Sequence, residues 1–221
     1  MSGVDFRRPA GQLELSVLLL GASAVGKSSL IRSFVGENFR FTNPATVGVD
    51  MKRRTVELEK RNKIVTLTLL DAAGQNTFES IVMSYFRSAD FYALIFDVTS
   101  KSSFEEVDNW MKRLNDLENM AENCIFVIGN KVDLEKEWKV SETELTNFCN
   151  GFPDPKPIPF LASAKTGELV EDVFTEMCEI VLDRMQTKKE KDRRSTIDTT
   201  LDPPKNSPKP KNSDDCGCLI L

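Results

Sequence analysis

The stretch GASAVGKS, residues 21–28, decides the fold of this chain. It has the spacing Gly-x-x-x-x-Gly-Lys-Ser, it follows the apolar run LELSVLLL, and it opens the helical pattern KSSLIRSF. Its glycines let backbone N–H groups close around phosphate oxygens at a helix terminus whose dipole favours anions. We expect Lys27 to reach the outer phosphates and the Ser28 hydroxyl to bind Mg²⁺. The residues predicted to contact phosphate are Ser23, Ala24, Val25, Gly26, Lys27, Ser28 and Ser29.

The alternative for this stretch is a glycine-rich turn with an incidental lysine. Average composition gives the four fixed positions by chance in roughly one chain in a hundred of this length. The strand–loop–helix context lowers that frequency further, so phosphate binding is the prediction.

Apolar runs alternate with helical patterns along the chain. The continuous runs, which are typical of strands covered on both faces, occupy residues 13–21, 91–99, 124–133 and 158–164. Residues 53–71 predict two further strands around a polar turn at Lys60–Lys63. Helical patterns occupy residues 26–36, 102–119 and 167–185. This order predicts an α/β fold with a mostly parallel six-stranded sheet, helices on both faces, and a ligand site beyond the carboxyl ends of the strands.

Composition sets limits on the kind of protein. We expect an N-terminal extension at 1–12, one domain at 13–186 and a flexible tail at 187–221, where four prolines occur. The net charge of −5 combines about −7 in residues 1–186 with about +2 in the tail, and the acidic body argues against nucleic acid as the main partner. With no histidine in the chain, a His-based zinc site and a Ser-His or Cys-His nucleophile are excluded. The first residues have no apolar run, so we expect no secretory signal.

Two segments indicate which base is bound. In NKVD, residues 130–133, Asp133 can accept hydrogen bonds from the N1–H and 2-amino group of guanine, a pattern that adenine lacks. Asn130 can bridge the acceptor edge of the ring to the phosphate-binding loop, and the Lys131 stem can lie along the base. In SAK, which comprises Ser163, Ala164 and Lys165, the Ala164 N–H could face the guanine oxygen. Each segment alone is a weak signal, but NKVD becomes a strong one because it directly follows the strand that comes next after residues 91–99.

Four residues are expected around the third phosphate. Asp71 ends a strand and could hold Mg²⁺ through water, while Gly74 allows a close backbone approach. Gln75 is placed to orient an attacking water. Thr46 could give its hydroxyl to the metal and its N–H to the γ-phosphate, so its loop would be ordered by GTP and released by GDP.

Together these motifs resemble the Ras superfamily of small GTPases and, within it, the Rab family. The resemblance covers residues 13–185, and its most Rab-like pieces are ATVGVD, SYFRSAD and IFDVTSKSSFEEVDNWMKRL. It implies that Phe39 packs against guanine and that residues 39–50 and 72–88 are switches I and II. It also implies a monomeric domain that cycles between GTP and GDP, controlled by exchange factors and GTPase-activating proteins and read by effectors.

The chain departs from the Rab pattern in both switches. Met51 and Leu70 stand where Rab sequences usually have Phe and Trp, which with Tyr85 form an effector-facing cluster. Because rigid aromatic anchors carry much of an interface's energy, we expect an unusual effector choice. DAAGQN replaces the usual DTAGQE around Gln75, which bears on the hydrolysis rate and not on nucleotide binding.

The chain ends in DDCGCLIL. CLIL fits a Cys-a-a-X box whose terminal Leu favours geranylgeranylation of Cys218, and Cys216 is a candidate for a second prenyl or a palmitoyl group. One lipid usually holds a protein weakly, so a second signal is expected. We therefore expect prenylation and dissociation-inhibitor machinery as partners and a place on the cytoplasmic face of an intracellular membrane.

These observations predict a prenylated, Rab-like GTPase that acts as a switch in membrane trafficking. Turnover should be slow, because no arginine is evidently placed to act in cis and a partner would supply one. The alternatives are a GTP-binding scaffold with little hydrolysis, a Ras-like signalling GTPase, and an ATP-using P-loop kinase, against which the Asn130–Asp133 segment speaks.

Overall fold

The computed structural model describes residues 13–41, 46, 48–72, 85–86, 88–116 and 124–198. The chain divides into a first unit, Met1–Leu182, and a second unit, Asp183–Leu221. The first unit contains a six-stranded sheet and the helices that cover it. The described residues of the second unit belong to the continuation of the last helix.

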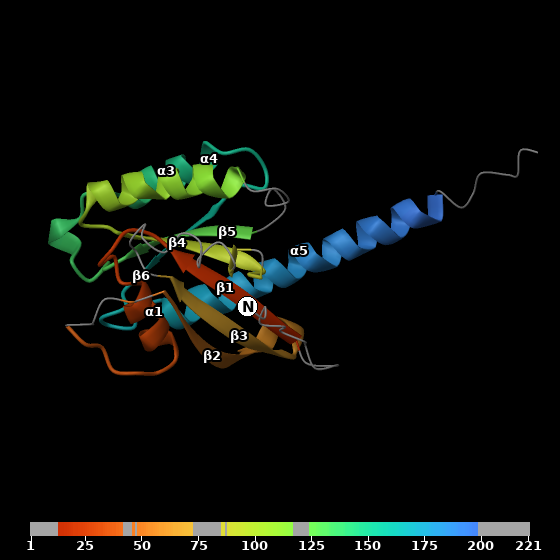
Figure 1. Ribbon diagram of the computed structural model, residues 1–221, viewed down its shortest axis with the longest axis horizontal. Helices are drawn as coiled ribbons and strands as arrows, with labels where there is room; N and C mark the ends of the chain where they lie inside the picture. Colours follow the sequence, from red (N-terminus) through yellow and green to blue (C-terminus); the bar gives the residue numbers. More distant parts are fainter. Residues whose placement is uncertain are drawn as a thin grey trace, which may run out of the picture. The chain divides into compact units, whose positions relative to one another are not determined.

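The sheet has the predicted strand number and is mostly parallel (Figure 1). Its strands are β1 (Leu13–Leu20), β2 (Val49–Leu58), β3 (Lys63–Ala72), β4 (Phe91–Asp97), β5 (Cys124–Asn130) and β6 (Ile158–Ala162). They lie in the order β2-β3-β1-β4-β5-β6, and only the pairing of β2 with β3 is antiparallel. The α/β fold class predicted from the sequence is confirmed.

Helices cover both faces of the sheet (Figure 1). They are α1 (Lys27–Phe34), α3 (Lys101–Asn115), α4 (Glu142–Asn150) and α5 (Val170–Asp198), with short 3₁₀ turns at Glu59–Arg61 and Glu135–Glu137. Helix α3 begins where the Ser100 hydroxyl accepts a hydrogen bond from the N–H of Ser103. Helix α4 was not predicted from the sequence, because this short helix buries only Leu145 and Cys149 and so carries little periodicity.

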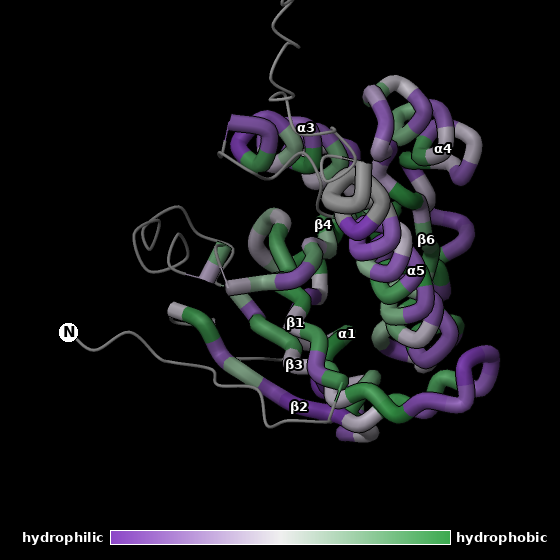
Figure 2. Tube along the Cα trace, turned by 90° about the vertical axis from the view of Figure 1, so that its right-hand side faces the viewer, coloured by the Kyte–Doolittle hydropathy of each residue, from purple (hydrophilic) through white to green (hydrophobic). Residues whose placement is uncertain are grey.

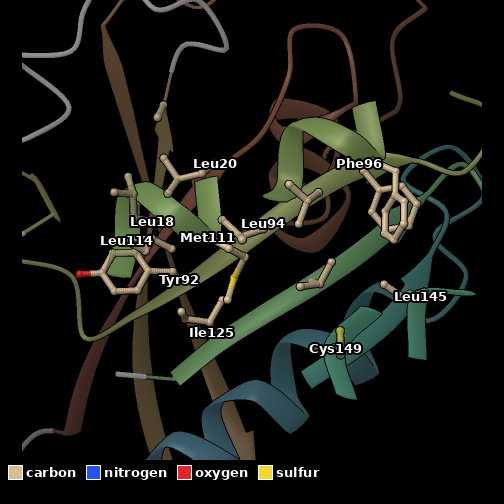
Figure 3. Close-up of a cluster of buried hydrophobic side chains, with 14 of the residues drawn as sticks. Leu18, Leu20, Tyr92, Leu94, Phe96, Met111, Leu114, Ile125, Leu145 and Cys149 are labelled. Carbon is tan, nitrogen blue, oxygen red and sulfur yellow. The ribbon is translucent and has the colours of Figure 1, made fainter. Parts of the chain in front are cut away.

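One face of the sheet packs against α3 and α4. Every residue of β4 and β5 is buried, which explains why their sequences are continuous apolar runs. Figure 3 shows part of the resulting cluster, in which side chains from β1, β4 and β5 meet those of the two helices. Its labelled members are Leu18, Leu20, Tyr92, Leu94, Phe96, Met111, Leu114, Ile125, Leu145 and Cys149. Because each large apolar side chain contributes about 1.5–3 kcal/mol on full burial, this cluster holds the strand ends in place.

The opposite face is covered by α1 and by the first part of α5 (Figure 1). The rings of Phe34 in α1 and Phe174 in α5 stack with their centroids 4.3 Å apart. The Arg54 guanidinium of β2 lies 4.5 Å from the Phe34 centroid and also pairs with Glu171. These contacts anchor α1, and with it the loop at its start, to the rest of the unit.

Strand β2 is an edge of the sheet and is largely hydrophilic (Figure 2). Charged side chains on an edge strand discourage pairing with other chains. Met51 on this strand is 45% exposed, whereas its cross-strand neighbour Leu70 is 2% exposed and Tyr85 is half-buried. Of the three positions expected to form an effector-facing cluster, Leu70 therefore lies in the core.

Helix α5 continues to Asp198, into the segment where the sequence analysis began a flexible tail at residue 187. Residues 184–191 are mostly strong helix formers such as Arg, Met, Gln, Lys and Glu, and the first proline after them is Pro203. Among the described helices, none has the length and apolar character needed to cross a bilayer.

We predict that truncating one core isoleucine costs far more stability than truncating an exposed one. Ile128 is fully buried in β5, so Ile128→Ala should lower the free energy of unfolding by about 2–5 kcal/mol. Ile64 in β3 is 58% exposed, and Ile64→Ala should change it by less than about 1 kcal/mol. Urea unfolding of both variants provides the measurement, and equal losses would contradict the assigned core.

Candidate functional site

The loop between β1 and α1 has the backbone shape that the sequence predicts for phosphate binding. Gly21 and Gly26 have φ values of 139° and 102°. A Cβ atom on Gly21 would lie 2.1 Å from the Ile95 carbonyl oxygen, and one on Gly26 would lie 2.3 Å from the Asn130 side-chain nitrogen. Any larger residue would therefore push the loop away from β4 and from Asn130.

Ala24 in the same loop also has a left-handed backbone, with φ 63°. A residue with a side chain pays about 1–2 kcal/mol for this conformation. The loop keeps its shape in spite of this cost, because its ends are fixed by β1 and by α1.

Lys27 lies inside the loop and is 6% exposed. Its ammonium donates hydrogen bonds to the carbonyl oxygens of Gly21 at 2.9 Å and Ala22 at 2.8 Å. Burial lowers the pKa of Lys27 to about 8, and the nearby Asp71 carboxylate opposes this change. A buried cation whose hydrogen bonds, among the described residues, go to neutral carbonyl oxygens would be stabilised by an anion, which is the charge a phosphate brings.

Ser28, Thr46 and Asp71 come together from three segments of the chain. The Ser28 hydroxyl donates to Asp71 Oδ2 at 2.5 Å and lies 3.1 Å from the Thr46 hydroxyl. Asp71 Oδ1 is buried and finds no hydrogen-bond partner among the residues that the structure describes. Burial raises the pKa of Asp71, while the hydrogen bond from Ser28 acts in the opposite direction.

This oxygen cluster fits a hydrated Mg²⁺ ion. Mg²⁺ prefers oxygen ligands and usually keeps several waters, so one or two carboxylates are enough. The unpartnered Asp71 Oδ1 is an acceptor that a metal-bound water could satisfy. In the part of the chain that the structure describes, no group of three or more His, Cys, Asp or Glu side chains could hold a metal. A site with several protein carboxylates is therefore not seen there.

Asn130, at the end of β5, contacts two loops through one side chain. Its Nδ2 donates to the Val25 carbonyl oxygen at 2.8 Å, and its Oδ1 accepts from the Ala164 N–H at 3.0 Å. The side chain is 1% exposed. Asn130 thereby joins the phosphate-binding loop to the SAK segment, and in this structure it uses the Ala164 N–H that the sequence analysis assigned to the guanine oxygen.

Asp133 is oriented by two residues of the SAK segment. Its Oδ1 accepts a hydrogen bond from the Ser163 hydroxyl at 2.6 Å, and its Oδ2 lies 3.4 Å from the Lys165 ammonium. The Ser163 oxygen in turn accepts from the Thr166 N–H at 3.2 Å. The carboxylate is therefore held in one direction without any ligand.

Asp97, at the end of β4, is a residue of this region that was not predicted from the sequence. The Lys131 ammonium lies 2.5 Å from Asp97 Oδ2. The available signal was the order Asp97, Val98, Thr99 at the end of a strand, which favours a turn in which the Asp side chain caps the backbone two residues on.

Of the remaining predicted positions, Phe39 lies within the described residues and the others do not. Phe39 is half-buried and meets Phe41 edge to face at 5.3 Å, and Phe41 is 87% exposed. Gly74 and Gln75 lie outside the described residues, as do Cys216 and Cys218.

Comparison with known proteins agrees with this geometry. A sequence profile of the Ras family matches residues 16–183. The chain is 37% identical to the Ras-related protein SEC4 of Candida albicans over 188 residues, which cover 83% of this chain and 85% of that protein. It is 30% identical to the Ras-related protein Rab-4 of Dictyostelium discoideum over 205 residues, covering 91% and 95% of the two chains.

A further relative is the Ras-related protein Rab-12 of Mus musculus, which is 34% identical over 179 residues, covering 80% of this chain and 71% of that protein. The profile covers the sheet except for the first three residues of β1, and it includes residues 21–28, 130–133 and 163–165. The chain belongs to the Ras family and is a Rab-like small GTPase.

Proposed function

We propose that the loop at 21–28, the NKVD segment and the SAK segment form one guanosine-nucleotide site, through which this GTPase acts as a switch in membrane trafficking. The observation that carries the proposal is the Asn130 side chain, which hydrogen-bonds both to Val25 in the phosphate-binding loop and to Ala164 in the SAK segment. Phosphate and base would therefore be bound by parts of the protein that are already connected.

At the phosphate end, the backbone of residues 23–29 would surround the phosphates and Lys27 would exchange its carbonyl partners for the outer phosphate oxygens. This exchange replaces neutral acceptors by charged ones, which strengthens the hydrogen bonds. Ser28 and Thr46 would hold Mg²⁺ directly and Asp71 would hold it through water. When bound, Mg²⁺ neutralises charge on the phosphate oxygens.

At the base end, Asp133 would accept hydrogen bonds from the N1–H and 2-amino group of guanine. The bonds from Ser163 and Lys165 aim its carboxylate before the base arrives. Asn130 would face the acceptor edge of the ring, and a guanine oxygen would share the Ala164 N–H with Asn130 Oδ1. The stems of Lys131 and Lys165 and the ring of Phe39 would pack against the base.

Hydrolysis would proceed by in-line attack of water on the γ-phosphorus, with cleavage of its bond to the bridging oxygen of GDP. Gln75 would orient the water and Gly74 would give a backbone N–H to the γ-phosphate. We expect a GTPase-activating protein to supply an arginine that stabilises the charge of the transition state.

The unusual second switch favours one alternative, a scaffold that holds GTP and hydrolyses it little. The reason for this alternative is the pair Ala72 and Asn76, which flank Gln75 within the DAAGQN segment. A Ras-like signalling role would use the same site with different effectors. The location and the partners of the protein, and not its chemistry, therefore distinguish that role from one in membrane trafficking.

For partners and location we propose effectors that bind switches I and II, an exchange factor, a GTPase-activating protein, and a lipid anchor on Cys218 with a second group on Cys216. The anchor would place the protein on the cytoplasmic face of an intracellular membrane, and dissociation-inhibitor machinery would return it to the cytosol. The support for the anchor is the terminal CLIL sequence.

We predict strong selection of guanine by Asp133. With Mg²⁺ present, GTP should displace a fluorescent GDP analogue at far lower concentration than ATP. Asp133→Asn replaces a charged acceptor by a neutral amide, so GDP affinity should fall about a hundredfold, the equivalent of one or two charge-assisted hydrogen bonds.

The matched control for that prediction is Asp172→Asn, which makes the same substitution at an exposed position in the first turn of α5. Its GDP affinity should equal that of the wild type. A wild-type protein that binds ATP as tightly as GTP would contradict the proposed function.

We predict that Gln75→Leu suppresses GTP hydrolysis and leaves GTP affinity nearly unchanged, because the side chain acts on the attacking water. Single-turnover hydrolysis, with and without an activating protein, should be at least about tenfold slower than in wild type. Gln186→Leu, on the exposed surface of α5, is the control. Equal rates would remove Gln75 from the mechanism, and a wild type that never hydrolyses GTP would favour the scaffold.

We predict a geranylgeranyl group on Cys218 in protein purified from its own cells. Mass spectrometry of the C-terminal peptide provides the measurement, and Cys218→Ser should shift the protein from the membrane to the soluble fraction. Cys149 serves as an internal control, because it is 2% exposed and burial raises its pKa to about 12. Unmodified Cys216 and Cys218 on a fully soluble protein would contradict the anchor.

A further inference from the structure

Lys131 has an unusual backbone for a residue with a long side chain. It follows β5 directly and has φ 70°, in the left-handed region that favours glycine. Its ammonium pairs with Asp97 Oδ2 at 2.5 Å, across from β5 to the end of β4. The ion pair therefore joins a strained residue of the NKVD segment to a neighbouring strand.

Asp97 is itself held rigidly. Its Oδ1 accepts hydrogen bonds from the Thr99 N–H at 2.8 Å and the Thr99 hydroxyl at 2.7 Å, which leaves Oδ2 for Lys131. Its own N–H donates to the Ser103 hydroxyl oxygen at 3.0 Å, at the start of α3. Asp97 is 8% exposed.

The carboxylate is charged in spite of this burial. Burial acts to raise the pKa of Asp97, but Lys131 and the two donors of Thr99 together lower it below its usual value. Lys131 therefore has an oriented anion as its partner and is not simply extended into water.

The pair adds little to the joining of β4 and β5. These strands are already paired in parallel from Phe91 with Cys124 to Asp97 with Asn130. Just beyond the last pair, the Val98 N–H donates to the Asn130 carbonyl oxygen at 3.1 Å. The ion pair instead fixes the direction of the Lys131 side chain, which lies between Asn130 and Asp133 in the sequence.

We infer that Asp97 is a positioning residue for guanine recognition: by holding the Lys131 ammonium, it presents the aliphatic stem of Lys131 in an ordered conformation for packing against the base. This inference rests on the proposed guanosine-nucleotide site. A lysine side chain loses much rotamer freedom when it is immobilised. Because Asp97 imposes that order before the nucleotide binds, the entropy is not lost at the binding step.

The first test is Asp97→Asn in the full chain with Mg²⁺. The amide oxygen still accepts from Thr99, but the charge that holds Lys131 is lost. The dissociation constant of a fluorescent GDP analogue should rise roughly tenfold, through faster dissociation. Lys131→Met keeps an apolar stem without the ammonium and should weaken GDP binding to a similar degree.

The decisive measurement is the double variant Asp97→Asn with Lys131→Met. If Asp97 acts through Lys131, the double variant binds GDP about as well as either single variant. Independent effects that multiply in the double variant would overturn the inference. So would an Asp97→Asn protein that binds GDP like the wild type.

Asp90→Asn is the matched control at the other end of β4. Asp90 Oδ2 accepts from the N–H and the hydroxyl of Ser16, each at 2.8 Å, away from the NKVD segment. Its GDP affinity should equal that of the wild type, even if its melting temperature falls. If Asp97→Asn yields no folded protein, Thr99→Val is tested in its place. This substitution removes the hydrogen bond from the Thr99 hydroxyl that helps to align Asp97. A Thr99→Val protein that binds GDP like the wild type would overturn the inference.

These outcomes separate the inference from the proposed function. A wild type that prefers GDP over ADP, combined with an Asp97→Asn variant of unchanged affinity, removes only the role of Asp97. A wild type without that preference contradicts the guanosine-nucleotide site itself.

Discussion

The side-chain amide of Asn130 is the contact on which the site depends. One end donates to the Val25 carbonyl oxygen in the phosphate-binding loop and the other accepts from the Ala164 N–H, while the side chain is almost fully buried. A buried amide whose donor and acceptor are both satisfied stabilises the structure, and losing one partner costs about 1–3 kcal/mol. The close approach of Gly26 belongs to the same arrangement, because a Cβ atom there would occupy the space of the amide. The two halves of the proposed nucleotide site are thus joined through the Asn130 side chain.

Two ionisable side chains near the phosphate end of the proposed site, Lys27 and Asp71, are buried and therefore poorly solvated. Lys27 is buried with carbonyl partners, and Asp71 is buried with one oxygen unpaired. The pKa of each is displaced towards the neutral form, chiefly by burial. Ionisable groups with perturbed pKa values collect at functional sites. A charged ligand can there offset the unfavourable burial of a group of the opposite charge. In the proposed function, a polyphosphate with Mg²⁺ would supply both an anion for Lys27 and a hydrated cation for Asp71.

The surface next to the site differs from the aromatic cluster expected of a Rab protein. Met51 on the edge strand is exposed and aliphatic, Leu70 beside it is buried, and Phe41 is largely exposed. Met is flexible and adapts to irregular partners, whereas Phe and Trp provide rigid anchors. Because the interface would lack two of those anchors, effectors of this chain should recognise a different shape from those that bind the aromatic cluster.

The amino-acid sequence by itself determined the fold class and the strand number, because continuous apolar runs and the glycine spacing of residues 21–28 constrain the backbone locally. It also predicted site roles for Ser28, Asp71, Asn130 and Asp133 by residue type and place, and these roles stay predictions. It did not reveal α4, whose periodicity is weak, or the burial of Leu70. Only the tertiary structure brought Asp97 to Lys131 and turned the Asn130 amide towards Ala164, because these contacts join residues far apart in the chain. Such partners depend on strand order and register, which no local pattern encodes.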